Sequence, residues 1–156
     1  MKGFVPTPCK TVDAMVELLF RDSRPAADDF VLDPGCGKGE FIDGVIRWCE
    51  ARNIALPNIV GVESDPGHMP ALCAKFDGIP KVRIELRDYL ISDARKFRYV
   101  IGNPPYVPIT KLSEEEKHRY RNSYATARGR FDLYLLFFEQ GLKNLADNGR
   151  LVFYHA

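Results

Sequence analysis

Residues 29–41 read DFVLDPGCGKGEF, a short apolar strand that runs into a glycine-rich loop and then into the start of a helix. Glycines at such a turn let the backbone approach a bound ligand closely. Strand and helix patterns alternate along the rest of the chain, which is typical of an α/β domain. Ligands of open α/β sheets bind at the carboxyl ends of the strands. The stretch therefore predicts a mostly parallel sheet flanked by helices, with a ligand site at this loop; a purely structural tight turn is the alternative.

Hydrophobic periodicity places the remaining elements. We expect helices over 11–20, 41–52, 69–76 and 131–149, and strands before Asp33 and over 58–65, 81–90, 97–105 and 150–156. The helix over 131–149 should be buried in its first half and should close at Asn148-Gly149 in a left-handed cap. Segment 107–130 should be mostly without regular structure, apart from a short helix over 113–121 capped by Ser113. Its many basic residues suit either a solvated surface or contact with a polyanion.

The composition narrows the functional classes. The 156 residues suit one domain, and the net charge of +1 argues against a free-standing nucleic-acid binder. The sequence contains no apolar run of membrane-spanning length. The four cysteines are scattered without a C-x-x-C pair, so we expect no metal site and free thiols in a reducing cytoplasm. A fifth strand at the chain end would leave an apolar edge, so we expect residues 1–156 to be part of a longer protein, or else an edge paired in a dimer.

Acidic residues follow three successive predicted strands: Asp33, Glu63 and Asp88. Glu63 is placed to accept hydrogen bonds from ribose hydroxyls and to repel a 2′-phosphate. Three acids at one sheet edge suit a cationic nucleoside better than a pyrophosphate. The alternative for each acid is a helix cap or a solvated loop residue.

Several motifs in this order resemble those of S-adenosylmethionine-dependent methyltransferases: VLDPGCGKGEF, GVESD, RDYL and NPPY at 31–41, 61–65, 87–90 and 103–106. FVPTP at 4–8 and the stretch FDLYLLFFEQGLKNLADNGRLVF resemble the γ-class adenine-N6 DNA methyltransferases of restriction–modification systems. The resemblance implies a Rossmann-like fold, S-adenosylmethionine as cofactor, DNA adenine as substrate, and a restriction or specificity subunit or domain as partner. The cofactor-binding residues it implies are Thr7, Pro8, Asp33, Pro34, Gly35, Cys36, Gly37, Glu63, Ser64, Asp88, Tyr89, Asn103 and Phe137.

Roles follow from the same resemblance. Thr7 and the loop 33–37 would hold the methionine end of the cofactor, and Asp88 would accept from the adenine amine. Tyr89 and Phe137 would flank the adenine ring, although for Phe137 a place in the apolar core is the alternative. The catalytic set would be Asn103, Pro104, Pro105 and Tyr106, with no metal.

The chemistry of NPPY suits methylation of an amine whose lone pair is delocalised. The Asn103 side-chain oxygen and the Pro104 main-chain carbonyl would accept both N–H bonds of the target amine. Such preorganised polar groups are typically worth about 3–4 kcal/mol each. Tyr106 would stack on a base that has left the duplex, for roughly 1–3 kcal/mol. A strand ended by Pro-Pro, with Tyr106 as packing, is the structural alternative.

The same motifs are compatible with other functions. NPPY also occurs in enzymes that methylate the glutamine amide of release factors and in some RNA methyltransferases, while cytosine-N4 enzymes usually carry Ser, Thr or Asp at the position of Asn103. A non-catalytic cofactor-binding subunit is a reading from another class, and a nicotinamide oxidoreductase ranks last. We expect the chain to lack a target-recognition domain and, in isolation, to methylate poorly or not at all.

Overall fold

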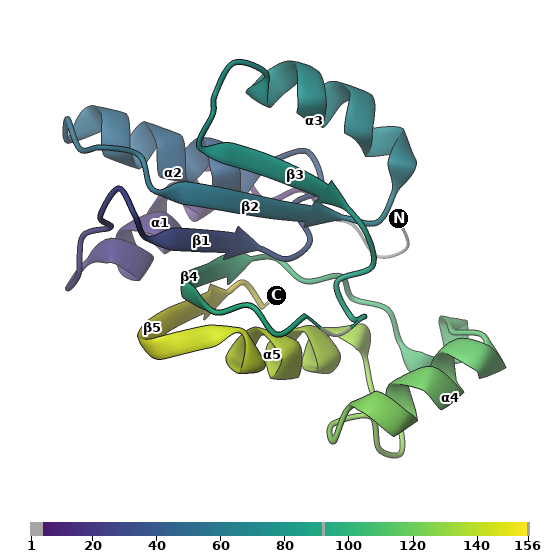
Figure 1. Ribbon diagram of the computed structural model, residues 1–156. Coiled ribbons are helices and arrows are strands. Elements are labelled where there is room, and N and C mark those ends of the chain that lie inside the picture. Colours follow the sequence, from purple (N-terminus) through teal and green to yellow (C-terminus); the bar gives the residue numbers. More distant parts are fainter. Residues whose placement is uncertain (1–4, 92, 156) are drawn as a thin grey trace.

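Five parallel strands form a single sheet in the order β3-β2-β1-β4-β5 (Figure 1). The computed structural model describes residues 5–91 and 93–155, so Phe4 of the FVPTP stretch and Ala156 of the last predicted strand lie outside the described residues. The strands are β1 (Phe30–Asp33), β2 (Asn58–Glu63), β3 (Val82–Leu86), β4 (Phe97–Gly102) and β5 (Leu145–Phe153). The predicted fold class, a mostly parallel sheet flanked by helices, is confirmed.

Helices cover both faces of the sheet, as parallel strands require. The longer helices are α1 (Cys9–Phe20), α2 (Glu40–Ala51), α3 (Met69–Phe76), α4 (Glu114–Ser123) and α5 (Leu133–Lys143). Side chains of α1, α2 and α3 share one buried cluster with Val31, whereas α4 and α5 share the other with Leu32. Successive side chains of β1 thus pack on opposite faces of the sheet, because side chains alternate across a strand.

The chain changes direction across the sheet at β1. β2 pairs with one side of β1, and β4 pairs with the other side, Leu32 lying opposite Val100. This is the topological switch point at which open α/β sheets bind ligands. Asp33 is the last residue of β1, and Asn103 follows the last residue of β4. The two residues therefore flank the expected site.

Most predicted elements are present within one to four residues. The helix predicted over 69–76 matches α3, and Ser113 caps α4 in a capping box with Glu116. The strands predicted over 81–90 and 97–105 end earlier, at Leu86 and Gly102. As a result Asp88, Tyr89 and the whole of NPPY lie in the loops that follow the strands.

The end of α5 was predicted wrongly. The helix stops at Lys143 rather than at Asn148-Gly149, and Leu145 already pairs with Phe97 of β4. Residues 146–149 form an irregularity before the pairing resumes between Tyr99 and Arg150. Asn148 does adopt a left-handed conformation (φ 58°), but inside β5, because tertiary pairing begins earlier than the sequence pattern suggests.

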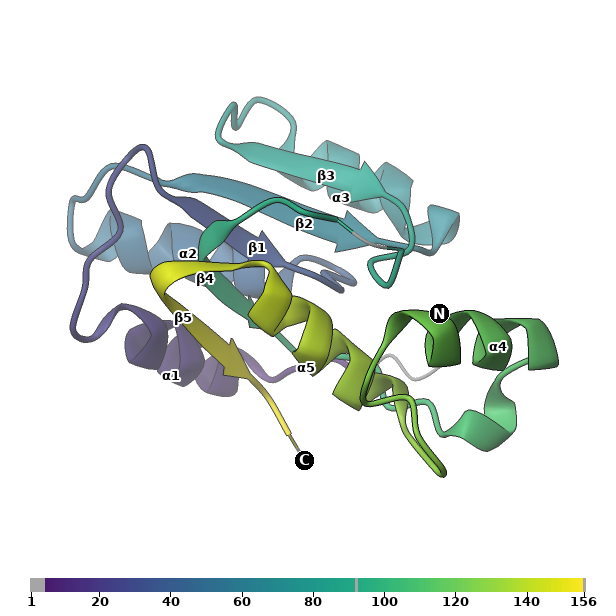
Figure 2. The same ribbon diagram turned by 60° about the horizontal axis from the view of Figure 1, so that its bottom comes forward.

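Two further expectations need correction. Segment 107–130 contains a 3₁₀ turn at Ile109–Lys111 as well as α4, and it buries Leu112, Tyr120 and Tyr124. Helix α5 is not buried all round. Leu135, Phe138 and Leu142 are 40–50% exposed because the sheet covers one side of the helix. Helix α4 stands beyond the carboxyl ends of the strands, near the first turn of α5 (Figures 1 and 2).

Candidate active site

A cavity of about 300 Å³ opens at the carboxyl ends of the central strands. It brings together residues that are far apart in sequence but were predicted to form one site. Those that line it are Pro34, Gly35, Ser64, Asp88, Tyr89, Pro105 and Phe137. The glycine loop, the ends of β2 and β3, the NPPY loop and helix α5 thus meet around one space.

The glycine loop is held by its own backbone. The Cys36 amide donates to the Val62 carbonyl at 2.9 Å, and the Gly39 amide donates to the Cys36 carbonyl at 2.7 Å. Gly37 and Gly39 have positive φ angles of 54° and 86°, which glycine adopts without strain. The Cys36 side chain is buried, and this burial raises the pKa of its thiol, so Cys36 acts as packing rather than as a nucleophile.

Asp33 is a buried acid. Within the described chain neither carboxylate oxygen has a well-formed hydrogen bond, the Gly35 backbone offering only a weak one, and the residue is 1% exposed. Burial raises the pKa of Asp33 well above its ordinary value of 3.8, and the Glu40 and Glu63 carboxylates add to the rise, while the Gly35 backbone partly offsets it. An unpaired buried carboxylate is costly, so this position suits a positively charged or hydrogen-bond-donating ligand.

Glu63 lies at the end of β2 as predicted, but its carboxylate is fully buried. One oxygen accepts from the Asp65 amide at 2.7 Å, and the other lies 3.3 Å from His68 Nδ1. The neighbouring Ser64, rather than Glu63, lines the cavity.

Asp88 and Tyr89 follow β3 and form the wall of the cavity next to α5. Asp88 is half-buried; one oxygen accepts from the Leu90 amide at 2.9 Å, and the other pairs with Arg119 of α4 at 3.3 Å. The rings of Tyr89 and Phe137 contact each other at 5.1 Å between centroids. They therefore form adjacent parts of one wall and do not lie on opposite sides of an adenine-sized gap.

Sequence reasoning predicted the short helix but missed its contribution to the cavity. Glu116 and Tyr120 of α4, and Leu112 just before it, line the cavity, although no residue of segment 107–130 was assigned to the site. The available signal was the capping box at Ser113 together with a tyrosine on the helix face that turns toward the core.

Asn103 lies at the switch point with its amide fixed in direction. Its Nδ2 donates to the Val5 carbonyl at 3.1 Å and to Thr7 Oγ1 at 3.0 Å. A carbonyl can only accept, so the NH₂ group must face Val5 and the Oδ1 atom must point the other way. Within the described chain, this buried Oδ1 has no hydrogen-bond partner.

Thr7 and Pro8 lie in the segment that precedes α1 and contacts Asn103. Thr7 is buried and contacts Asn103, and the Pro8 carbonyl accepts the first amide bonds of α1. Neither residue lines the cavity.

Tyr106 is held at its hydroxyl and at its ring. The hydroxyl donates to the Tyr154 carbonyl at 3.0 Å, and the ring stacks on Tyr134 at 5.6 Å with an interplanar angle of 12°. The adjacent Val107 amide donates to Asp132, the N-cap of α5, at 3.1 Å. The NPPY loop is thus bound to the start of α5, and its Pro104 and Pro105 are buried.

Residues 5–91 and 93–155 contain no group of three or more His, Cys, Asp or Glu side chains that could hold a metal ion. No helix in this part of the chain combines the length and apolarity that crossing a bilayer requires. The four cysteines are free thiols.

Fold comparison defines the class first. The chain superimposes with a TM-score of 0.75 on a type I restriction-modification system methyltransferase subunit from Streptococcus thermophilus, at 17% identity, covering 98% of this chain and 35% of that one. It superimposes with a TM-score of 0.73 on a protein of Listeria monocytogenes assigned to the class I S-adenosylmethionine-dependent methyltransferases, at 20% identity, covering 93% and 43%. The chain has the Rossmann-like fold of S-adenosylmethionine-dependent methyltransferases.

Sequence comparison then gives the family. The family model described as Eco57I restriction-modification methylase matches residues 59–155. Type II methyltransferase M.BstVI of Geobacillus stearothermophilus is 40% identical over 183 residues, covering 97% of this chain and 33% of that protein. Modification methylase CviBIII of Paramecium bursaria Chlorella virus NC1A is 34% identical over 124 residues, covering 79% and 29%. The chain belongs to the Eco57I restriction-modification methylase family.

S-adenosylmethionine is the cofactor of this family and fold. The residues present fit it, because the buried Asp33 carboxylate has no well-formed hydrogen bond within the described chain and the adjacent Pro34 and Gly35 line the cavity. The chain spans about a third of the length of the curated relatives it matches.

Proposed function

We propose that this chain carries the methyl-transfer site of a restriction–modification DNA methyltransferase that acts on the N6 amine of adenine. The observation that carries the proposal is Asn103 Oδ1, a buried acceptor aimed away from Val5 and Thr7 and left without a hydrogen-bond partner in the described chain. An amine with two N–H bonds is the kind of group that such an acceptor is built to hold. A cytoplasmic location and a restriction or specificity partner belong to the same proposal.

The cofactor side of the site would be divided between two groups of residues. Asp33 and the loop 33–37 would bind the charged methionine end, and Asp88 with Tyr89 and Phe137 would bind the adenosine end. S-adenosylmethionine, when bound, supplies an electrophilic methyl group. Glu63 is buried beside His68, whereas Ser64 lines the cavity and would bind the ribose. Binding of the ribose by Glu63 would require the 65–68 turn to rearrange.

The amine side would be held by the NPPY loop. Asn103 Oδ1 and the Pro104 carbonyl would accept the two N–H bonds, which directs the nitrogen lone pair toward the methyl donor. Both acceptors would also stabilise the positive charge that develops on nitrogen, at typically about 3–4 kcal/mol each. Tyr106 would stack on the flipped base for roughly 1–3 kcal/mol.

DNA is favoured by the curated relatives, which are named modification methylases and type II methyltransferases. Adenine is favoured by Asn103 at the first position of NPPY. Methylation of RNA or of a glutamine amide uses the same clamp chemistry and remains the second candidate, since the clamp recognises an NH₂ group rather than the ring that carries it.

The test is to identify the product. The protein at its full natural length is incubated with methyl-labelled S-adenosylmethionine and unmethylated DNA, RNA and protein in parallel, and the labelled unit is identified after digestion. We expect N6-methyladenine in DNA. Label in RNA or on glutamine would overturn the proposed substrate, and cofactor binding without any label would indicate a non-catalytic subunit.

A further inference from the structure

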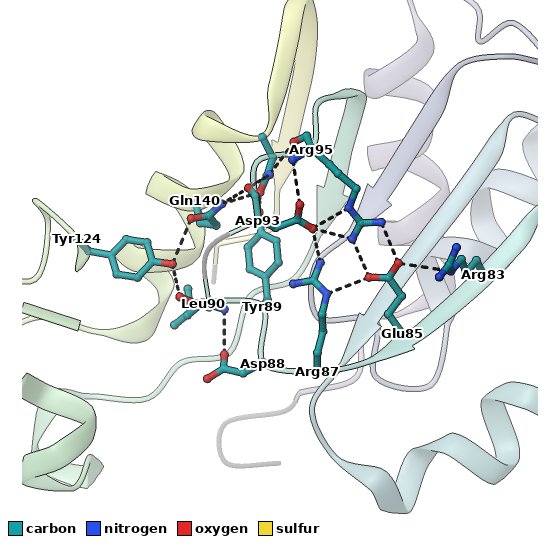
Figure 3. Close-up of polar contacts among 11 residues, drawn as sticks. Arg83, Glu85, Arg87, Asp88, Tyr89, Leu90, Asp93, Arg95, Tyr124 and Gln140 are labelled. Carbon is teal, nitrogen blue, oxygen red and sulfur yellow. Dashed lines mark hydrogen bonds and ion pairs between the residues drawn. The ribbon is translucent and has the colours of Figure 1, made fainter. Parts of the chain in front are cut away.

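A buried amide network holds the cavity wall that carries Asp88 and Tyr89 (Figure 3). Its centre is Asn144, which follows α5 and is fully buried. Asn144 Oδ1 accepts from the Tyr89 hydroxyl at 2.8 Å, and its Nδ2 donates to the Asp93 and Arg95 carbonyls at 2.8 Å each. Gln140 Nε2 donates to Asn144 Oδ1 at 3.0 Å, so every hydrogen-bonding position of the Asn144 amide is used.

Two more side chains extend the network. Gln140 Nε2 also lies 3.3 Å from the Asp93 carbonyl. The Tyr124 hydroxyl, just beyond α4, donates to the Leu90 carbonyl at 2.6 Å and lies 3.2 Å from Gln140 Oε1. Asn144, Gln140 and Tyr124 thus attach the described part of segment 88–95 at Tyr89, Leu90, Asp93 and Arg95.

Ion pairs, rather than buried hydrogen bonds, hold the outer side of this segment. Arg95 pairs with Glu85 at 2.7 Å and with Asp93 at 2.6 Å, and Arg87 pairs with Asp93 at 2.8 Å (Figure 3). The arginines of this cluster are partly exposed, so salt screens these pairs, although Arg95 holds Glu85 through two parallel bonds of 2.9 and 2.7 Å. Buried hydrogen bonds are less affected by solvent, so the inner amide network is the part that fixes the wall.

We propose that Asn144, Gln140 and Tyr124 are positioning residues for the adenine-binding wall of the cofactor site; this inference rests on the proposed function. These three side chains do not line the cavity, so they act through Tyr89 and through the backbone of 90–95. Tyr89 is the direct link, because its hydroxyl is fixed by Asn144 while its ring contacts Phe137.

The test compares two Tyr→Phe variants that lose similar bonds. Tyr124→Phe removes the hydroxyl that holds Leu90. Tyr99→Phe is the matched control, because Tyr99 is also buried and its hydroxyl donates to the Ser23 carbonyl at 2.9 Å, but on the opposite face of the sheet. Tyr89→Phe is a third variant, which keeps the ring and removes only the bond to Asn144.

Each full-length variant is tested for S-adenosylmethionine binding, melting temperature, kcat and KM. We expect Tyr124→Phe and Tyr89→Phe to weaken binding about five- to tenfold, the effect of losing a buried hydrogen bond. For Tyr124→Phe, KM for the cofactor should rise, with kcat at saturating cofactor nearly unchanged. Tyr99→Phe should lower the melting temperature similarly but leave cofactor affinity within about twofold of the wild type.

Unchanged affinity in Tyr124→Phe, or an equal loss in Tyr99→Phe, would overturn the positioning role while leaving the proposed function intact. A wild-type protein that binds no S-adenosylmethionine would overturn the proposed function and this inference with it.

Discussion

A buried carboxylate that lacks well-formed hydrogen bonds within the described chain, such as that of Asp33, costs free energy until a ligand pairs with it. Burial raises the pKa of Asp33, so the native state binds a proton more tightly than the unfolded state does. The stabilising effect of that proton is complete below the unfolded pKa and is lost as the pH rises through the raised folded pKa. The ligand-free protein is therefore less stable at neutral pH than it would be with a neutral residue at this position.

Asp33→Asn tests this account. We expect the ligand-free variant to melt at a higher temperature than the wild type at neutral pH, and the difference to shrink as the pH falls toward about 4. Cofactor binding should be lost at every pH. Thermal unfolding across the pH range measures both trends, and a melting difference that does not change with pH would contradict the account.

Arg119 forms an ion pair with Asp88, the carboxylate that would accept the adenine amine of the cofactor in the proposed site. Its ion pair with Asp88 is 3.3 Å long and partly exposed, so its removal should change stability by at most about 1 kcal/mol. We expect Arg119→Gln to bind S-adenosylmethionine a few times more tightly, because a competing donor and a like charge are both removed. Arg121→Gln, on the same helix, is the control. Equal or weaker binding in Arg119→Gln, measured by calorimetry, would show that the pair does not compete with the cofactor.

At the scale of elements, the turn into α2 depends on Gly39. A Cβ at Gly39 would lie 2.6 Å from the Phe76 ring, and the φ of 86° is unfavourable for other residues. We expect Gly39→Ala to destabilise the protein by more than about 2 kcal/mol, from backbone strain and the ring clash together. Gly78→Ala, at φ 78° with open space around it, isolates the strain and should cost about 1–2 kcal/mol. Urea denaturation compares the two, and equal losses would contradict the contribution of the Phe76 contact.

The sequence predicted those elements whose signals are local. The Ser113 cap of α4 and the glycine loop before α2 are fixed by neighbouring residues, and both were predicted. The end of α5 was not, because Asn144 stops the helix by bonding to Tyr89 and to backbone carbonyls fifty residues away in sequence. Residues of the candidate site such as Gly35, Asp88 and Pro105 were predicted from motifs, whereas Arg119 and Tyr120 depend on where α4 packs.

At the scale of the whole molecule, cofactor binding should be coupled to stability. S-adenosylmethionine at a hundred times its dissociation constant should add about 2.7 kcal/mol to the free energy of unfolding. Its cation and a proton compete for Asp33, so at a fixed cofactor concentration the gain should increase as the pH rises. Melting temperatures at graded cofactor concentrations measure this gain, and Asp33→Asn is the control. A gain that fell with rising pH would contradict the assignment of Asp33.

The chain spans about a third of the length of the curated relatives it matches, and residues of this chain line the cavity described above. The cofactor cavity, the switch point and the NPPY loop are assembled by residues 5–155. Turnover is therefore tested with the protein at its full natural length.

The central claim is that Asn103 holds an amine for methyl transfer, and Asn103→Ala tests it most directly. The full-length wild type and variant are compared for S-adenosylmethionine affinity and for single-turnover methylation of unmethylated DNA, with Asn122→Ala on the exposed face of α4 as the control. The account predicts a methylation rate lowered by about a hundredfold or more, with cofactor affinity nearly unchanged. A variant that methylates DNA at the wild-type rate would contradict it.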